Sequence, residues 1–505
     1  MKKFLTLFLL LLSVCVAADT EIRIVHTNDT HARIVPVDSK SHGDNVSGAG
    51  RRAALIARAR REFPGLLVLD AGDMFQGTPF FNFFKGEACY RIASLIGYDA
   101  TTLGNHELDL PLDNLQEKLE ISGLRMLCCN VFFRNSQQPV FKPYHVFRRN
   151  GRNIAVIGSI GDDGWESIDV KNKAMLTYKP QKEAVSKLAG RLRPHVDLII
   201  LLSHSGFEAD QKMAEEINDL DIIIGGHTHT EVYHPTLVKH QKPGARNGLN
   251  GTIVAQAGEH GIFLGNLSVW LDDQGKIATF TGNLQKIDAA IDLPVPAQIQ
   301  TLIEGYHKQL EEKMQQIAGF SSFELEYPKS INKTHLLPMG NFAAAAMQMA
   351  AKADVCLVNS GGIRGGIKDG KITWGQIYEA LPYDNTVVTF LMKGKQVKQM
   401  FDFIATNFKD LDGFQLSGVE GELNTLEKRS VSLTINKKPI DDTRVYRVCT
   451  SSFIANGNLG GDKIFCQVEG VEDSGIFMRD AAIAYLQHHK EMPDLKENPL
   501  KLVVE

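Results

Sequence analysis

A chain of 505 residues is too long for one ordinary hydrophobic core, so two or more domains are expected. The hydrophobic content of 43% and the charged content of 23% are typical of a soluble globular protein. A formal net charge of −4 provides no basic surface for a nucleic-acid polymer, so we expect no partner of that class.

The first 18 residues have the pattern of a secretory signal peptide. Lys2 and Lys3 precede an apolar run over residues 4–12, and small residues end the segment at Val16-Ala-Ala18. The run is too short to span a bilayer, which takes about 20 apolar residues. The C-terminus has no apolar tail that would indicate a glycolipid anchor. We therefore expect a secreted chain, periplasmic or extracellular, with no membrane span in its mature form and a formal charge lowered from −4 to −6 by the loss of Lys2 and Lys3.

Six cysteines remain after the predicted cleavage. An even number in a secreted chain permits disulfides, and no pair has the spacing of a zinc finger. The prediction is that they are buried or paired structural residues: Cys89, Cys128, Cys129, Cys356, Cys449 and Cys466.

From Glu21 to Asp288, apolar β-rich runs alternate with helical patterns, which favours a layered α/β domain with a largely buried sheet. Helices are predicted at 51–62, 88–96, 112–120, 181–192 and 209–218. Residues 37–50 and 239–250 are predicted to be loops. Residues 262–287 alternate between apolar and polar side chains, as a β-hairpin does.

The second half begins with a predicted linker helix. Pro294 and Pro296 precede a segment, 297–317, with apolar residues at helical spacing, and Gly319 follows it. We therefore expect a first domain over 19–293, a linker helix over 294–319 and a second domain over 320–505. Helices at 341–352, 395–406 and 475–488 and strands at 355–359, 387–392 and 430–435 predict a mixed α/β second domain.

Five apolar runs of the first half end in side chains that can bind metals. If the runs are strands whose ends converge on one crevice, these side chains form a metal site. Two ligands that are two residues apart, as in the first and last of these motifs, lie on one face of an extended segment. In chain order the five ends supply Asp29 with His31, then Asp73, then Asn105 with His106 and Asp109, then His204, then His227 with His229.

The mixture of carboxylate, amide and imidazole ligands suits zinc or manganese, and the absence of Cys and Met disfavours copper. Seven ligands are too many for one tetrahedral ion. Two ions about 3.5–4 Å apart, bridged by a carboxylate and a water, would use them all. Such a pair would acidify the water and neutralise charge on a phosphoryl group, while His106, held in one tautomer by Asp109, would face the leaving or an equatorial oxygen. The first half contains no obvious covalent nucleophile.

Other polar residues near these runs have simpler interpretations. Asp70 ends the same run as Asp73 and is interpreted as a residue that caps the following loop or lies outside the ligand set. Asp162 and Asp163 also follow an apolar run, but no histidine accompanies them, so they are predicted to be loop residues. His26 is expected to pack within its strand.

The motifs Asp29-Thr-His31, Gly72-Asp73, Gly104-Asn-His-Glu107, Ser203-His204 and Gly226-His-Thr-His229 resemble those of the calcineurin-like metallophosphoesterases. The extension of the third motif to Asp109, together with a large second domain, is similar to the 5′-nucleotidase branch, which includes periplasmic UDP-sugar hydrolases and ecto-5′-nucleotidases. The resemblance implies a layered α-β-β-α metallophosphoesterase domain, joined by the linker helix to a mixed α/β C-terminal substrate-binding domain. It also implies that rotation about this helix brings the nucleotide to the metals.

The resemblance also implies a role for each ligand. Asp29, His31, Asp73 and His229 match the residues that hold one ion. The other ion is held by Asp73 as the bridge, Asn105, His204 and His227. Relatives carry Gln, Asn or His at the position of His229. His106 and Asp109 match the catalytic dyad of the family.

In the second half, Asn359-Ser-Gly-Gly-Ile-Arg364 resembles a glycine loop whose arginine reaches the substrate phosphate, and an arginine fork suits phosphate geometry. Tyr383 and Phe453 match two aromatic residues that clamp the base, and Asp462 matches a carboxylate that binds ribose hydroxyls. Relatives usually carry a further phosphate-binding Arg shortly before the segment that matches 339–341. Here only two residues could replace it, Lys333 or His335.

The sequence therefore predicts a secreted two-metal 5′-nucleotidase that hydrolyses nucleoside 5′-monophosphates by in-line attack of a metal-activated water. Alternatives within the superfamily are a UDP-sugar or dinucleotide pyrophosphatase and a 2′,3′-cyclic phosphodiesterase with 3′-nucleotidase activity. Thiosulfohydrolases share the N-terminal fold but do not need a base clamp. A different class, an inactive nucleotide-binding surface protein, is disfavoured because every ligand and the dyad are present. The choice between zinc and manganese, the preferred base and the oligomeric state stay open.

Overall fold

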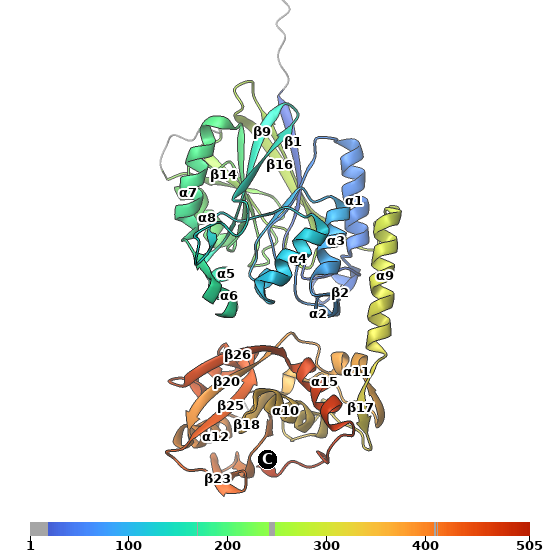
Figure 1. Ribbon diagram of the computed structural model, residues 1–505, viewed down its shortest axis with the longest axis vertical. Coiled ribbons are helices and arrows are strands. Elements are labelled where there is room, and N and C mark those ends of the chain that lie inside the picture. The colour runs from blue at the N-terminus through green and yellow to red at the C-terminus, as the bar shows by residue number, and fades with distance from the viewer. Residues whose placement is uncertain (1–18, 169, 242–247, 409–410, 412, 505) are drawn as a thin grey trace, which may run out of the picture. The chain divides into compact units, whose positions relative to one another are not determined.

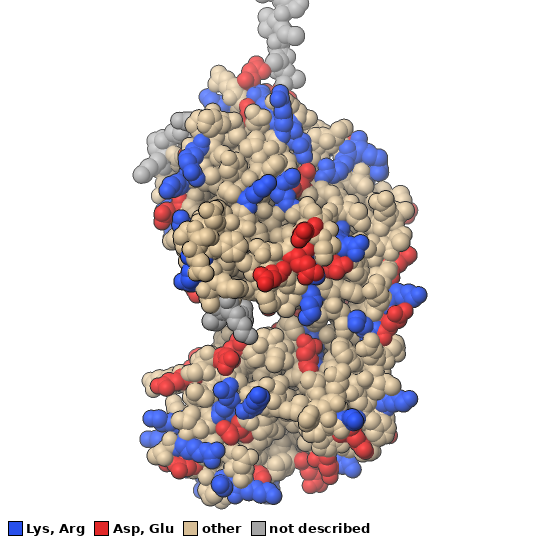
Figure 2. All heavy atoms as spheres, viewed as in Figure 1, with Lys and Arg blue, Asp and Glu red and all other residues tan. Residues whose placement is uncertain are grey.

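The computed structural model describes residues 19–504, except for 169, 242–247, 409–410 and 412 (Figure 1). The predicted signal peptide lies outside the described residues. Contacts within the chain divide it into two units, Met1–His307 and Lys308–Glu505, and the division falls inside the predicted linker helix. Within the described part, no helix combines the length and the apolar character needed to span a membrane. On the face seen in Figure 2, basic side chains are interspersed with acidic ones, in keeping with the small net charge.

The first unit contains two six-stranded sheets. In the first sheet the order is β16-β15-β1-β4-β5-β6. The strands β1, β4, β5 and β6 are parallel, and β15 and β16 form the antiparallel hairpin predicted from the alternating pattern. Their bounds are β1 Thr20–Thr27, β4 Leu67–Asp70, β5 Ala100–Thr102, β6 Met126–Leu127, β15 Phe263–Leu271 and β16 Ile277–Lys286.

The second sheet has the order β13-β14-β12-β11-β9-β8. Its four central strands are parallel, and the two edge strands, β8 and β13, are antiparallel to their neighbours. The bounds are β8 Tyr144–Arg149, β9 Arg152–Ile160, β11 Leu198–His204, β12 Ile222–Gly225, β13 Thr236–Lys239 and β14 Gly251–Ala255.

Alternation along the strands explains the layers. In β11, Leu198, Ile200 and Leu202 join the core between the two sheets, together with residues of β1 and β4. Ile199 and Leu201 point to the other side and pack with the helices α7 (Gln181–Leu192) and α8 (Phe207–Glu216). Successive side chains of a strand face opposite sides, so a continuously apolar strand fits only a sheet covered on both faces.

Helices complete the sandwich. Figure 1 shows α7 and α8 on one side of the two sheets, and α1 (Ala49–Glu62), α3 (Glu87–Ile96) and α4 (Leu112–Ser122) on the other. These five helices agree with the predicted segments to within two residues at every end. The layered α-β-β-α architecture predicted for this domain is therefore confirmed.

Smaller elements correct two predictions. The predicted loop over 37–50 contains the strands β2 (Val37–Ser39) and β3 (Gly43–Val46), which pair around a turn where Gly43 has a φ of 87°. Asp162 and Asp163 begin a short helix, α5 (Asp162–Glu166), because carboxylates are favourable in a first helical turn. Half of the predicted loop over 239–250, residues 242–247, lies outside the described residues, and Lys239 ends the strand β13. The remaining short elements are α2 Pro79–Phe84, α6 Val170–Met175, β7 Val131–Phe133 and β10 Leu176–Tyr178.

The predicted helix over 297–317 is shorter in the structure. The helix α9 spans Ala297–Met314, and Ile317–Ser321 forms the strand β17, paired with β19 (Gly370–Thr373). Gly319 therefore lies inside a strand and does not cap the helix. A Cβ atom on Gly319 would lie 3.0 Å from the Cβ atom of Leu486, so the glycine allows the close approach of α15 (Met478–His489).

The second unit contains a five-stranded sheet with the order β21-β18-β25-β20-β26 and a four-stranded sheet with the order β24-β23-β22-β27. The predicted strands and the first two predicted helices are present. Gly475, predicted to begin a helix, belongs to β26, and α15 starts only at Met478. The bounds are β18 Val355–Asn359, β20 Thr386–Lys393, β21 Phe414–Ser417, β22 Glu420–Asn424, β23 Arg429–Ile435, β24 Lys438–Pro439, β25 Val445–Ser451, β26 Glu469–Phe477, β27 Leu500–Val503, α10 Pro338–Ala351, α11 Trp374–Ala380, α12 Gly394–Asn407, α13 Ser452–Ala455 and α14 Gly461–Ile464.

The six cysteines of the described chain are free thiols. Five are buried, and Cys466 is exposed. Cys356 and Cys449 are neighbours on the paired strands β18 and β25. The prediction that these residues are buried holds for all but Cys466.

Candidate functional site

The five strand ends singled out in the sequence meet in the first unit. They follow β1, β4 and β5 of one sheet and β11 and β12 of the other, and within each sheet these strands are parallel. Because parallel strands end at the same edge, the polar residues that follow them gather there. The structure brings together two groups of ligand atoms, each within 4.8 Å of one another: Asp29, His31 and His229, and Asp73, His204 and His227.

The first group is compact. The Nε2 atoms of His31 and His229 are 3.2 Å apart. Oδ1 of Asp29 lies 3.4 Å from Nε2 of His229 and 3.9 Å from Nε2 of His31. Asp29 and His31 are buried, while the His229 side chain is 37% exposed.

The second group surrounds the fully buried His204. Its Nε2 atom lies 3.1 Å from Oδ2 of Asp73 and 3.2 Å from Oδ1 of Asn105. The ring of His227 is 5.1 Å from that of His204, measured between centroids. Nε2 of His204 is also 4.0 Å from Oδ1 of Asp29, so the two groups adjoin each other. All seven predicted metal ligands are therefore at one place.

Backbone carbonyls orient two of the imidazoles. Nδ1–H of His204 donates to the carbonyl oxygen of Ala71 at 2.8 Å, and Nδ1–H of His31 donates to that of Phe75 at 3.1 Å. A carbonyl can only accept, so the proton of each neutral ring is on Nδ1. The lone pair of Nε2 then faces the cluster, as a metal-binding histidine requires.

The residues fit divalent ions. Burial alone would lower the pKa of His204, but the carboxylates of Asp73 and Asp29 outweigh this effect and raise the pKa to about 10. The buried cluster therefore favours positive charge. Burial raises the pKa of Asp73, but the imidazoles of His204 and His106 bring it well below its ordinary value. Ligands bound tetrahedrally at about 2.0–2.1 Å lie roughly 3.3 Å from one another, a spacing similar to that of the atoms in both groups.

The backbone at the site adopts strained conformations. A side chain in the left-handed region costs on the order of 1–3 kcal/mol, and such residues gather at functional sites. Hydrogen bonds between loops hold this geometry, because Asp29 N–H donates to Gly72 O at 2.9 Å and His31 N–H to Asp73 O at 3.0 Å. Five of the seven predicted ligands have positive φ: Asp29 (49°), His31 (44°), Asp73 (55°), His227 (82°) and His229 (56°).

Two glycines of the motifs are required by close approach. A Cβ atom on Gly104 would lie 2.1 Å from Oδ1 of Asp73. One on Gly226 would lie 3.0 Å from both Oδ2 of Asp29 and Nδ1 of His204. A side chain at either position would displace the ligands.

Two buried carboxylates support the loops. Glu107, whose role the sequence reasoning missed although it lies in the Gly104–Glu107 motif, accepts hydrogen bonds from the backbone N–H groups of Asp73, Met74 and Gly104 at 2.8–2.9 Å. Burial and the neighbouring Asp73 raise the pKa of Glu107 to about 8. Asp70 accepts from Gly72 N–H at 2.9 Å, so it caps the loop as predicted.

The predicted dyad lies at the edge of the cluster. Nδ1 of His106 is 2.8 Å from Oδ2 of Asp109, and the two side chains are 31% and 28% exposed. The His106 ring is 5.4 Å from the His31 ring, and the backbone N–H of His106 donates to Oδ1 of Asp73 at 3.0 Å. Burial alone would lower the pKa of His106, but Asp109 and Asp73 outweigh this effect and raise the pKa to about 10. The ring can therefore carry a proton to donate.

A sixth strand end also reaches the cluster. Glu259 and His260 follow β14, and Oε2 of Glu259 lies 2.8 Å from Nδ1 of His229. The sequence reasoning missed both residues. The signal that could have found them is the one that located the other motifs, because an acid and a histidine follow the short apolar run over 253–255.

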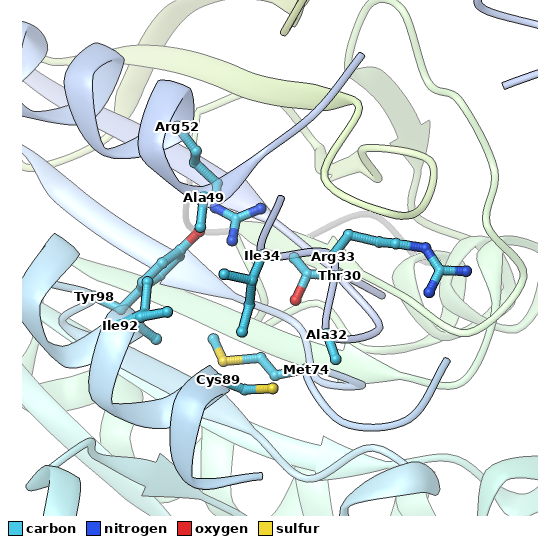
Figure 3. Close-up of a pocket in the computed structure, with 11 residues that line it drawn as sticks. Thr30, Ala32, Arg33, Ile34, Ala49, Arg52, Met74, Cys89, Ile92 and Tyr98 are labelled. Carbon is cyan, nitrogen blue, oxygen red and sulfur yellow. The ribbon is translucent and has the colours of Figure 1, made fainter. Parts of the chain in front are cut away.

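A cavity of about 20 Å³ lies between the loop after β1 and the helices α1 and α3. It is lined by Thr30, Ala32, Arg52, Cys89 and Tyr98, among others (Figure 3). Such a volume holds about one water molecule. It is too small for a substrate.

The second unit has a pocket of about 370 Å³. Four of the five residues predicted to bind substrate line it: Asn359, Arg364, Tyr383 and Phe453. Two aromatic side chains that are 46% and 38% exposed, Tyr383 and Phe453, present flat surfaces to a ligand.

The remaining predicted residues of this half lie elsewhere. Asp462 is exposed in the first turn of α14, and among the described residues neither it nor Lys333 nor His335 belongs to the lining. Asn385 and Leu459, which the sequence reasoning missed, line the pocket instead. The expected contact of Asp462 with a ligand is therefore not part of this pocket.

Arg479 fixes the loop that carries Tyr383. This side chain is 2% exposed, donates to the carbonyl oxygen of Tyr383 at 3.2 Å and forms an ion pair with Asp384. Its guanidinium lies 4.9 Å from the ring centroids of both Tyr378 and Phe477. These contacts hold the backbone of the loop that presents the exposed ring of Tyr383.

Comparisons with known proteins agree with this geometry. The family of calcineurin-like phosphoesterases matches residues 22–231, and the 5′-nucleotidase C-terminal domain matches residues 299–465. The chain is 28% identical to a trifunctional nucleotide phosphoesterase protein of Bacillus subtilis, over 90% of this chain but 33% of that protein. It is 28% identical to a 5′-nucleotidase of Rattus norvegicus, over 88% of this chain and 84% of the other.

Solved structures point the same way. A 5′-nucleotidase precursor from Thermus thermophilus superposes with a TM-score of 0.63 at 28% identity, and the match covers 96% of this chain and 100% of that one. The protein is therefore a metal-dependent phosphoesterase, and it belongs to the 5′-nucleotidase family of calcineurin-like metallophosphoesterases.

Proposed function

We propose that the protein is a secreted two-metal 5′-nucleotidase, which hydrolyses nucleoside 5′-monophosphates to nucleoside and phosphate. One observation carries the proposal: Arg364, Tyr383 and Phe453 line a single pocket, where a phosphate-binding group accompanies two exposed aromatic rings. A phosphoesterase that acted on small phosphate esters would not need the rings. Residues 19–293 would be the catalytic domain, 294–319 the linker helix and 320–505 the substrate-binding domain.

In this proposal Asp29, His31, Asp73 and His229 hold one divalent ion, zinc or manganese. Asp73, Asn105, His204 and His227 hold the other. When bound, the two ions would acidify an attacking water and neutralise charge on the phosphoryl oxygens. The buried carboxylates supply negative charge for both ions, and the carbonyls behind His31 and His204 keep Nε2 of each ring free for binding.

His106 is the candidate proton donor. With Nδ1 bonded to Asp109, the ring presents Nε2 to a phosphoryl or leaving oxygen and stabilises the charge that develops there. Asp109 holds the ring in this orientation. No covalent step on the protein is needed, because water is the nucleophile.

Nucleotide recognition is assigned to the second unit. The base would stack between Tyr383 and Phe453, a contact worth about 1–3 kcal/mol per base. Arg364 would bind phosphate through its fork of N–H donors, and Asn359 lines the same pocket. Asp462 stays a prediction for the ribose hydroxyls, because its exposed position in α14 is outside the pocket lining.

The test is phosphate release by the purified protein from AMP, UMP and 3′-AMP, measured with excess EDTA and then with added zinc or manganese. Hydrolysis of UDP-glucose and 2′,3′-cyclic AMP is followed by chromatography, since their cleavage need not free phosphate. We expect metal-dependent turnover, fastest on AMP or UMP. Failure of the metal-replete protein to hydrolyse any of the five while it still binds AMP would instead indicate an inactive nucleotide-binding protein.

The second candidate is a pyrophosphatase that acts on UDP-sugars or dinucleotides. One observation favours it: a relative at 28% identity is named a trifunctional nucleotide phosphoesterase, so a chain of this kind can act on more than one class of nucleotide ester. Faster cleavage of UDP-glucose than of AMP would support this candidate over the first.

A further inference from the structure

The loop after β14 is tied to the residues that supply the first metal ligand. The side chain of Asn28 accepts from Ala257 N–H at 2.7 Å and donates to the carbonyl of Gly258 at 2.6 Å. The backbone N–H of His260 donates to the carbonyl oxygen of Asp29 at 2.7 Å. These bonds flank Glu259 on both sides and hold its backbone at a fixed place beside the Asp29 group.

The carboxylate of Glu259 faces His229. Its Oε2 atom lies 2.8 Å from Nδ1 of His229 and 3.3 Å from Nε2 of His260. The opposite nitrogen of His229, Nε2, lies 3.4 Å from Oδ1 of Asp29 and 3.2 Å from Nε2 of His31. His229 therefore bridges Glu259 and the first group of ligand atoms.

The bond from His229 to Glu259 decides which nitrogen can bind an ion. An ionised carboxylate can only accept, so Nδ1 of His229 donates and Nε2 of the neutral ring keeps its lone pair. Backbone carbonyls do the same for His31 and His204. At His229, which has a φ of 56° and a side chain 37% exposed, a carboxylate takes this role.

We propose that Glu259 is a positioning residue for the first metal ion. It fixes the tautomer and ring orientation of His229 and thereby makes this half-exposed imidazole a ligand. The inference rests on the proposed two-metal site, in which Asp29, His31, Asp73 and His229 form one ion site. Outer carboxylates of this kind commonly raise metal affinity by about 10–100-fold.

The direct test is metal binding by the metal-free full-length mature protein, titrated with zinc or manganese against a competing chelator. The metal content per chain is measured in parallel. For Glu259→Ala, we expect one of the two ions to bind about 10–100-fold more weakly, while the other binds as in the wild type. Glu259→Gln keeps an oxygen that can accept from Nδ1, so it should lie between the two.

A double-mutant comparison separates orientation of His229 from support of the loop. In a His229→Gln background, Glu259→Ala should change the affinity of the weaker ion by less than about twofold. Two mutations that act independently have additive effects, whereas the effect of Glu259→Ala disappears if Glu259 acts only through His229. His260→Asn removes the second contact of Glu259 and serves as the matched control, with wild-type affinity expected. A loss of affinity from Glu259→Ala that persists in full in the His229→Gln background would overturn the inference.

The outcomes also distinguish this inference from the proposed function. A wild-type protein that binds no divalent ion overturns both. A wild-type protein with two ions, and a Glu259→Ala variant that binds both with unchanged affinity, overturns the role of Glu259 and leaves the two-metal proposal standing. Thermal unfolding in EDTA checks that the variants fold, and Glu259→Gln supplies the affinity measurement if Glu259→Ala is unstable.

Discussion

At the scale of single residues, the chemistry depends on which neighbour each imidazole has. Backbone carbonyls fix His31 and His204, and carboxylates fix His106 and His229. In the proposed mechanism the neighbour of each ring therefore decides whether Nε2 faces a metal ion, as at His31, His204 and His229, or a substrate oxygen, as at His106.

Asp109→Asn tests the proton donor. The carboxylate of Asp109 is the strongest influence that raises the pKa of His106 against the effect of burial, so its removal lowers that pKa. The protonated ring is then lost at a lower pH, and the alkaline limb of the kcat profile should move to lower pH. We expect kcat at neutral pH to fall by about 10²–10⁴-fold. Steady-state rates between pH 5 and 10 measure this, and an unshifted limb with wild-type kcat would contradict the assigned dyad.

Tyr383→Ala tests the base clamp. Loss of stacking worth about 1–3 kcal/mol should raise KM for AMP by about 5–150-fold. The kcat value should change little, because Tyr383 belongs to the second unit, whereas the proposed proton donor and metal ligands belong to the first. Tyr383→Phe keeps the flat surface and is the matched control with near wild-type KM. Equal kinetics for Tyr383→Ala and Tyr383→Phe would remove Tyr383 from nucleotide binding.

At the scale of elements, the loops after β4 and β5 depend on one buried carboxylate. Oε1 of Glu107 accepts from Met74 N–H and Phe75 N–H, and Oε2 accepts from Asp73 N–H and Gly104 N–H. Each loop carries a predicted metal ligand, Asp73 or Asn105, so the carboxylate of Glu107 links the stability of the fold to the geometry of the candidate site.

Glu107→Gln should therefore destabilise the protein. Whichever way the amide is turned, its NH₂ group faces backbone N–H donors and leaves them without an acceptor. Each unsatisfied buried group costs about 1–3 kcal/mol, and we expect a loss of that size in the free energy of unfolding. Urea denaturation in EDTA measures it. The exposed Glu120 of α4 offers a control, since Glu120→Gln should change stability by less than about 0.5 kcal/mol. Equal midpoints for the two variants would refute the role of Glu107.

At the scale of the whole molecule, each unit has its own core. One unit carries the metal-binding cluster and the other the pocket with the aromatic rings. A ligand that binds only the folded form of one unit stabilises that unit by mass action. Metal and nucleotide should therefore act on different parts of the unfolding curve.

Calorimetry should show this separation. Removal of divalent ions with EDTA leaves the buried carboxylates of Asp29 and Asp73 without cations, so the transition of the N-terminal unit should move to lower temperature. At free metal about 1,000 times Kd the difference corresponds to about 4 kcal/mol. The transition of the C-terminal unit should stay in place with EDTA and rise with AMP. A melting curve that EDTA does not change would contradict a metal-bound first unit.

The sequence by itself determined the elements and most of the chemistry. The apolar runs of β11 and β12 could only be strands buried on both faces, and parallel strands place their ends at one edge, so Asp29, His204 and His227 could be predicted to meet. The left-handed φ angles of five ligands could not be foreseen, because that geometry is set by contacts between loops far apart in sequence.

Only the tertiary structure decided which outer residues support the site. Glu259 is 30 residues from His229 in the sequence, and their hydrogen bond exists because Asn28 ties the loop after β14 to the Asp29 loop. Gly319 read locally as a helix stop, yet it lies in a strand because α15 packs against it. Leu459 and not Asp462 lines the pocket of the second unit. Local sequence patterns indicate which chemistry a residue can perform, whereas the packing of segments far apart in the sequence decides which groups it contacts.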